Sequence, residues 1–367
     1  MTHLKGETAL DLRDGNVLKG LAILAIVFHN YFHLLPDAAT ENEFDFATDR
    51  FHYFLATVSD PRHAIQAVFS YLGHYGVQIF IFLSAYGLAV KHWEIRSWSG
   101  FLWSRIRKIY PTWFLALALF LLLKVAQDGP QEFATYLQRE GDELVLTGLA
   151  ILTLLPGYGL PPVGPWWFLP FIIQFYCIWS LLAGFTRRFG GRGLFLLSVA
   201  GLAVTVAAMP VLGKYRITLL TTPIGHLPEI ALGIAVARYG MSVRPGVLAV
   251  ALVAFLIGNL TFWVWPTTYT SILLLMLGGY AIAGRWLRGR RALVWLGQIS
   301  MPLFFVNGFL RGPFWPLGRS GIWYLQLVGG LAFAATSVGV AYLLWLTERW
   351  IMSHASGRRE PQVEPAA

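Results

Sequence analysis

The chain has very little cysteine and very little charge. Cys177 is its one cysteine, which excludes an intrachain disulfide and any metal site built from a cysteine cluster. Charged residues make up only 13% of the 367 residues, whereas 56% are hydrophobic. Several apolar runs of about twenty residues are long enough to cross a bilayer, which excludes a soluble globular protein. The sequence therefore predicts an all-α, polytopic membrane helical bundle.

The sequence motifs of nucleotide-driven pumps and of common hydrolases are also absent. The chain has no Walker loop, no Rossmann glycine fingerprint and no GxSxG elbow, which argues against an ATP-driven pump and the usual serine hydrolases. The net charge is +9, but the basic residues are scattered between apolar runs, so we expect no nucleic-acid partner. His29 and His33 have the spacing of two metal ligands, but no HExxH motif accompanies them, and we expect no metal site.

Charge between the apolar segments predicts how many of them cross the membrane. The segment 144–158 is short and runs into a turn-rich stretch, Pro156 to Pro162. If it dips in and returns, 20 Lys and Arg residues lie on one side and 8 on the other, but if it spans, the split is 12 against 16. Lys and Arg favour the cytoplasmic side. We therefore expect about ten transmembrane helices plus one short re-entrant segment at 144–165, which points to a cavity. The eleven segments lie near 17–35, 64–90, 109–125, 144–158, 166–186, 193–212, 217–237, 245–264, 268–284, 292–310 and 322–347.

These segments predict a single membrane domain over residues 1–352. The first run continues without a small-residue cleavage site, so we expect it to be an uncleaved anchor. Residues 353–367 are polar and contain proline, which predicts a disordered cytoplasmic tail. We expect a multi-pass protein of the cell inner membrane with both termini in the cytoplasm.

Ionisable side chains inside apolar runs are the first candidates for a functional site. His29 lies ten residues after Lys19 in the first run, which at ~1.5 Å per residue puts it near the middle of a ~30 Å slab. A neutral imidazole can accept or release a proton there, although a packing histidine is the alternative. Glu229 is the one acidic residue placed inside an apolar segment of this topology. It needs a proton or a partner such as His226, and its role is either structural or that of a proton relay.

Two groups of residues at the ends of other runs are candidates for binding. Arg105, Arg107 and Lys108 precede the third run, where they either anchor the topology or bind the phosphates of a nucleotide-like donor at a helix N-terminus. Trp167 and Gln174 lie two turns apart, so both can face one cavity, where the indole would stack on a sugar ring. The other candidates for substrate binding are Asn30, Gln78, Tyr86 and Tyr176.

Five stretches of the chain carry a resemblance to a known family. They are LKGLAILAIVFHN (18–30), FIFLSAYGLA (80–89), SRIRKIYP (104–111), WWFLPFIIQFY (166–176) and HLPEIALGIAVAR (226–238). Their order and spacing resemble the acyltransferase type 3 family of integral membrane proteins, from about Arg13 to Glu348. The chain departs from the family pattern where Lys19 replaces an arginine and where Asn307 replaces a histidine. The family's RxxR motif appears as Arg105-Ile106-Arg107-Lys108.

The resemblance implies an acyltransferase that moves an acyl group, commonly acetyl from acetyl-CoA, onto a hydroxyl of a carbohydrate or lipid-linked glycan. It implies that His29 is essential, as general base or as acyl carrier, and that Lys19 joins the basic residues of the third run in binding the donor. Acyl-CoA would be a substrate, with no permanently bound cofactor. The alternative reading of the same residues is a proton-coupled transporter or flippase, in which His29 and Glu229 relay protons across the bundle.

Overall fold

The computed structural model describes residues 10–36, 38, 41–240 and 244–355, and no strand occurs among them. The all-α class is therefore confirmed. The α-helices are α1 (Leu12–Phe32), α2 (Thr48–Val58), α3 (Ala64–Leu72), α4 (Gly76–Lys91), α5 (Trp98–Gly148), α6 (Phe168–Leu212), α7 (Leu227–Tyr239), α8 (Pro245–Gly258), α9 (Thr267–Arg288), α10 (Arg291–Gln298), α11 (Ser300–Val306), α12 (Trp315–Gly318) and α13 (Trp323–Ala355). The 3-10 turns are η1 (Gly73–Tyr75), η2 (Leu152–Leu154), η3 (Gly164–Trp167), η4 (Gly213–Tyr215), η5 (Leu219–Thr221) and η6 (Gly312–Phe314).

Six helical segments in the described part of the chain are long and apolar enough to cross a membrane. This identifies a membrane protein, but the expected count of about ten spans is not confirmed. The apolar helix α8 has only 14 residues. The run 144–158 forms no spanning helix, because α5 ends at Gly148 and residues 149–163 contain only the turn η2. The six segments are Leu12–Phe32, Ala64–Lys91, Trp98–Gly148, Gly164–Tyr215, Thr267–Arg288 and Trp323–His354.

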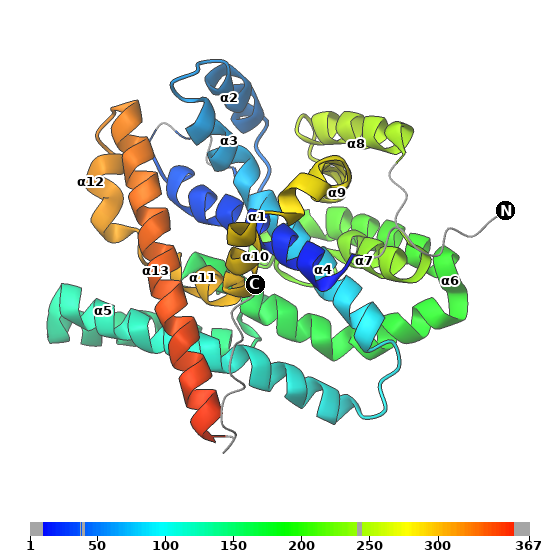
Figure 1. The fold of residues 1–367 in the computed structure, drawn as a ribbon, viewed down its shortest axis with the longest axis horizontal. Coiled ribbons are helices and arrows are strands. Elements are labelled where there is room, and N and C mark those ends of the chain that lie inside the picture. Colours follow the sequence, from blue (N-terminus) through cyan, green and yellow to red (C-terminus); the bar gives the residue numbers. More distant parts are fainter. Residues whose placement is uncertain (1–9, 37, 39–40, 241–243, 356–367) are drawn as a thin grey trace.

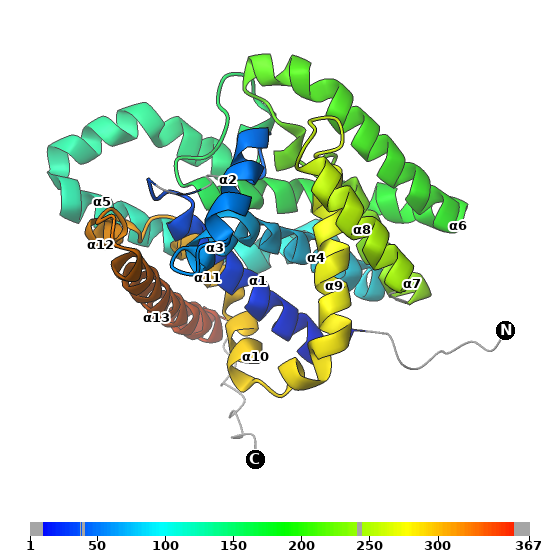
Figure 2. The same cartoon turned by 90° about the horizontal axis from the view of Figure 1, so that it is seen from above.

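The two longest helices each bend at a glycine. Gly129 has a φ of 82° within α5 and precedes Pro130, and Gly190 has a φ of 58° within α6. These left-handed conformations favour glycine, and proline removes a helical hydrogen bond. The bend gives α6 a V shape (Figure 2). Its two arms correspond to the expected separate runs 166–186 and 193–212.

Helix α1 forms the centre of the bundle (Figure 1), in contact with α3, α4, α10, α11 and α13. In the most apolar 18-residue stretch of α1, 67% of the residues are buried. The corresponding share is 72% for the α3–α4 segment and 17–39% for the other four candidate spans. The side chains of Asp11 and Asp14 form a capping box that starts α1. A Cβ on Gly20 would lie 2.1 Å from the carbonyl oxygen of Leu293, so glycine lets α1 and α10 meet closely.

Candidate functional site

A cavity of about 270 Å³ lies beside the C-terminal half of α1. Its polar wall combines side chains from α1 with side chains from four other parts of the chain, including two connecting loops. The run 144–165 contributes Leu160, Gly164 and Pro165, so the segment expected to mark a cavity does contribute to one. The polar and aromatic residues on the wall are His29, Asn30, His33, Asn42, Glu43, Phe44, His74, Trp167, Phe304 and Arg311.

His29 is held against the start of the α3–α4 segment. Its Nδ1 lies 3.2 Å from the carbonyl oxygen of Phe69. Because a carbonyl oxygen can only accept, Nδ1 carries the proton of the neutral ring, and Nε2 keeps a free lone pair. A Cβ on Gly73 would lie 2.7 Å from the Cβ of His29, so glycine is what allows this close approach. The ring is only 4% exposed, yet it is part of the cavity wall.

Two further imidazole rings lie next to the His29 ring. The His33 ring stacks on the His29 ring with centroids 4.3 Å apart, and its Nδ1 donates to the backbone oxygen of His29 over 2.7 Å. The His74 ring lies 5.3 Å from His29. Both ring nitrogens of His74 are buried without a hydrogen-bond partner among the described residues. In the same part of the chain, no group of three or more His, Cys, Asp or Glu side chains is arranged to hold a metal ion.

Glu43 brings a carboxyl group into the cavity from the loop that follows α1. It is 7% exposed, and its Oε1 accepts a hydrogen bond from Nε1 of Trp167 over 3.1 Å. Its backbone oxygen accepts from the hydroxyl of Tyr269 over 3.0 Å. Burial raises the pKa of Glu43 to about 7, although the Trp167 hydrogen bond and the nearby His226 act against this rise. The carboxyl can therefore gain or lose a proton near neutral pH.

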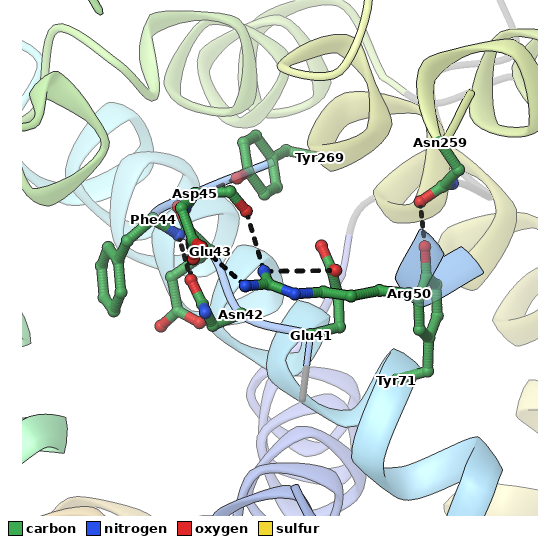
Figure 3. Close-up of polar contacts among 9 residues, drawn as sticks. All are labelled: Glu41, Asn42, Glu43, Phe44, Asp45, Arg50, Tyr71, Asn259 and Tyr269. Atoms are coloured by element: carbon green, nitrogen blue, oxygen red, sulfur yellow. Dashed lines mark hydrogen bonds and ion pairs between the residues drawn. The ribbon is translucent and has the colours of Figure 1, made fainter. Parts of the chain in front are cut away.

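The loop around Glu43 is fixed by its own polar side chains (Figure 3). Oδ1 of Asn42 accepts from the backbone nitrogens of Phe44 and Asp45, over 2.7 and 3.3 Å. Arg50 binds the Asp45 carboxylate at 2.6 Å and lies 3.8 Å from the carboxylate of the buried Glu41. Burial raises the pKa of Glu41 to about 8, although Arg50 acts in the opposite direction. These contacts hold the loop that carries Glu43.

Asn30 links the cavity to the chain after α11. Its Nδ2 donates to Oδ1 of Asn307 over 2.5 Å, and its backbone oxygen accepts from Nη1 of Arg311 over 2.9 Å. The Nδ2 of Asn307 donates to the backbone oxygens of Leu303 and Phe304. Asn307 thus supports Asn30 from behind, and Asn30 itself lies on the wall.

Basic residues gather at the other end of α1. Lys19 lies within electrostatic range of Lys91 and Lys108, and Lys108 lies within range of Arg105. Arg105 donates to Nε2 of His92 over 2.6 Å. Arg107 is exposed and makes no ion pair within the described ranges. We call Lys19, Lys91, Arg105 and Lys108 the basic cluster.

Two tyrosines expected on the substrate side lie toward this end instead of the cavity wall. The hydroxyl of Tyr86 donates to the backbone oxygen of Leu10 over 2.9 Å. The ring of Tyr176 packs edge-on against Phe101, with centroids 6.1 Å apart, and lies within electrostatic range of Arg105. Neither tyrosine lines the cavity that contains His29.

Glu229 and two glutamines also lie outside the cavity wall. Oε2 of Glu229 lies 3.4 Å from Nδ1 of His226, a partner that the sequence suggested, and Thr270 donates to Oε1. The His226 ring lies between Glu229 and Trp167, stacked 6.3 Å from the indole. Nε2 of Gln174 donates to the backbone of Ala150 and to Thr153, so it holds the 149–163 loop. Gln78 is fully buried, and its amide has no partner among the described residues.

Three ionisable residues of the cavity wall are not identified from the sequence. Glu43 lies in an acidic loop whose charges indicate only sidedness, although its aromatic neighbours Phe44 and Phe46 are a sign of burial. His74 is flanked by Gly73 and Gly76 within an apolar run. Arg311 follows an apolar run directly, and a cation in that position usually marks the end of a membrane span. No local feature of the sequence distinguishes such a residue from one that lines a cavity.

Comparison with known proteins gives one match. A family model described as an acyltransferase domain matches residues 14–346. No curated protein and no solved structure matches the chain. The matched range includes nearly all of α1, the whole cavity wall and the basic cluster.

Proposed function

The chain belongs to the acyltransferase type 3 family of membrane proteins, and from this premise we propose that it acylates a hydroxyl of a carbohydrate or related acceptor, with acyl-CoA as donor. Acetyl is the acyl group we expect. The observation that carries the proposal is the free Nε2 of His29 on the wall of a cavity. An imidazole with one free nitrogen can take a proton from a hydroxyl or attack a carbonyl carbon.

The donor would bind at the basic cluster. Ammonium and guanidinium groups pair well with phosphate oxygens, and no carboxylate pairs with these four side chains among the described residues. The distribution of Lys and Arg between the runs supports a cytoplasmic position for this end. Ten residues separate Lys19 from His29, about 15 Å along the helix. The flexible arm of CoA would have to extend across that gap.

The acceptor would enter the cavity from the opposite, outer side. Ligand pockets commonly have volumes of roughly 300–1,000 Å³, so a cavity of about 270 Å³ fits one sugar residue better than a long chain segment. Trp167 offers an aromatic ring, and Glu43 and Asn30 offer groups that bind hydroxyls.

Two chemical sequences are consistent with this arrangement. In direct transfer, Nε2 of His29 takes the acceptor's hydroxyl proton while the oxygen attacks the thioester carbonyl. The C–S bond then breaks, and the CoA thiolate takes up the proton. In a relay, Nε2 attacks the thioester first, the C–S bond breaks and CoA leaves as the thiolate. The acceptor oxygen then attacks the acyl carbon, the C–N bond breaks, and the hydroxyl proton passes to solvent, which protonates the thiolate. Both need the Nδ1–H to Phe69 contact, because it leaves Nε2 unprotonated.

A proton-coupled transporter is the competing function. It would need His29 and Glu229 to lie along one polar route. Glu229 instead lies off the cavity, paired with His226 and Thr270. This arrangement favours a structural role for Glu229.

Release of CoA by the purified full-length protein tests the proposed function. The acceptor would be identified by mass spectrometry of surface glycans from cells with and without the protein. We expect His29→Ala to slow CoA release by about 10²–10⁴-fold, the usual contribution of a general base. His63→Ala is the matched control, since His63 lies outside the cavity and binds Asp60 at 3.1 Å. A folded His29→Ala protein with a near-normal rate would remove His29 from the mechanism.

A further inference from the structure

Arg311 is a cation without a counter-charge on the wall of the His29 cavity. It forms no ion pair with any described residue, and the one influence on its pKa is burial, which lowers that pKa to about 10. The guanidinium is therefore still charged at neutral pH. Glu43 lies on the same wall, but no ion pair joins it to Arg311 among the described residues, and neither group influences the pKa of the other.

Most of the hydrogen-bonding capacity of Arg311 is unused. Its Nη1–H donates to the backbone oxygen of Asn30 over 2.9 Å, and no other hydrogen bond of its side chain occurs within the described ranges. A guanidinium presents several further N–H donors in a planar fork. Arg311 is half-buried, so these unused N–H groups of a charged guanidinium are available to a negative group that enters the cavity.

The contact with Asn30 leaves most of the positive charge of Arg311 uncompensated. It places a cation beside the last turn of α1, where helix carbonyls carry partial negative charge. Partial charge compensates only a fraction of a full positive charge. His33 lies within electrostatic range of Arg311, and its imidazole brings no negative charge.

We propose that Arg311 binds an anionic group of the acceptor, a carboxylate or a phosphate, so that the enzyme selects acidic sugars or sugar phosphates. This inference rests on the proposed function and names its substrate class. Arg311 is bonded to the residue next to His29, so an anion held there brings the acceptor's hydroxyls close to Nε2 of His29. Repulsion between the bound anion and the Glu43 carboxylate would fix the orientation of the sugar.

Equilibrium binding to the purified full-length protein in neutral detergent tests the proposal. The probes are glucuronate, glucose 6-phosphate, inorganic phosphate and glucose. We expect glucuronate or glucose 6-phosphate to bind about tenfold or more tightly than glucose, as for a charge-assisted contact. Arg311→Gln should abolish that preference. Arg319→Gln should retain it, because Arg319 lies outside the cavity, over the ring of Trp315.

Three results would overturn the proposal. In the first, the anionic sugars bind no more tightly than glucose. In the second, Arg311→Gln still binds the anionic sugars more tightly than glucose. In the third, inorganic phosphate binds as tightly as glucose 6-phosphate. The last would indicate a free-anion site instead of an acceptor site. Binding needs no acyl transfer, so His29→Ala should keep the preference while losing CoA release. This separates failure of the proposal from failure of the proposed function.

Arg311→Lys keeps the charge beside α1 and serves if Arg311→Gln does not fold. A lysine cannot reproduce the paired hydrogen bonds of the guanidinium fork. We expect the KM for glucuronate-containing acceptors to rise about threefold to tenfold, with no change for neutral acceptors. Equal changes for both classes would show that Arg311 only caps α1, and would overturn the proposal.

Discussion

The two ends of α1 carry polar groups of different kinds. At the cavity end, His29, Glu43 and Asn30 are enclosed, and each is oriented by a hydrogen bond from a distant segment. At the other end, the basic cluster holds four cations near one another without a carboxylate partner in the described part of the chain. The cavity end is organised before any ligand arrives, whereas the basic end holds unpaired cations that an anionic ligand would balance.

This difference predicts that the two ends control different substrates. Changes in the basic cluster should weaken binding of the donor, and changes in the cavity wall should weaken binding of the acceptor. A variant at one end that weakens binding of both substrates would contradict this division.

The largest separation is expected from the double variant Lys19→Gln, Lys108→Gln. Each hydrogen bond to a charged group contributes about 1.5–3 kcal/mol, so loss of both should raise the KM for acyl-CoA by roughly a hundredfold or more. The KM for the acceptor should not change. Rates of CoA release at varied acyl-CoA and varied salt measure the effect, because screening weakens the wild-type interaction selectively. Arg96→Gln is the control, an exposed arginine before α5, and an equal rise in the acceptor's KM would contradict the assignment.

Glu43→Gln should alter the pH dependence at the cavity end. Burial raises the pKa of Glu43 from its usual 4.5 to about 7, so the folded protein holds a proton that the unfolded chain releases across that range. Wild-type stability should therefore fall as pH rises from about 4.5 to 7, and Glu43→Gln should reduce that fall. The neighbouring charged groups are Glu41, Asp45, Arg50 and His226.

Melting temperature and acceptor KM, followed across pH 5–8, measure this effect. In the wild type, the acceptor KM should change near pH 7, where Glu43 titrates. In Glu43→Gln this step should be absent, while the KM for acyl-CoA should be the same in both proteins at each pH. Asp60→Asn serves as the control, since Asp60 is an exposed carboxylate outside the cavity. An unchanged step in Glu43→Gln would show that another group titrates there.

The smallest effect is expected from Glu229→Gln. The amide oxygen can still accept from Thr270, and Glu229 lies off the cavity. We expect the rate of CoA release to change by less than about threefold, within the spread of a buried structural contact. A loss beyond tenfold that Glu229→Asp restores would instead assign Glu229 a proton-transfer role.

The sequence singles out His29, Asn30 and Trp167, which all line the cavity, but it does not identify Glu43, His74 or Arg311. Glu43 and Arg311 come from loops, and no sequence periodicity links loop residues to a helix far along the chain. The spacing of Trp167 and Gln174 predicted one shared face. Trp167 ends the 3-10 turn η3, and α6 begins after it. In the structure their roles differ, because Trp167 lines the cavity whereas Gln174 holds the 149–163 loop.

The number of membrane spans is likewise only partly predictable from the sequence. Hydropathy locates the apolar runs, but it does not show where a run breaks into shorter helices. The run 292–310 divides at Ile299 into α10 and α11, and Pro228 starts α7 well inside the run 217–237. Proline at the first turn fixes such a start, whereas the break at Ile299 depends on packing against α1.

Thiol accessibility at position 29 tests the central claim most directly, that this side chain faces a cavity open to the outer side. With a single native cysteine, a Cys177→Ser background is free of thiols. In that background, His29→Cys should react with a small membrane-impermeant methanethiosulfonate added from outside. Ile23→Cys should not, because Ile23 is fully buried in the same helix and lies off the cavity wall. A cysteine at position 29 that is as unreactive as the one at position 23 would contradict the account.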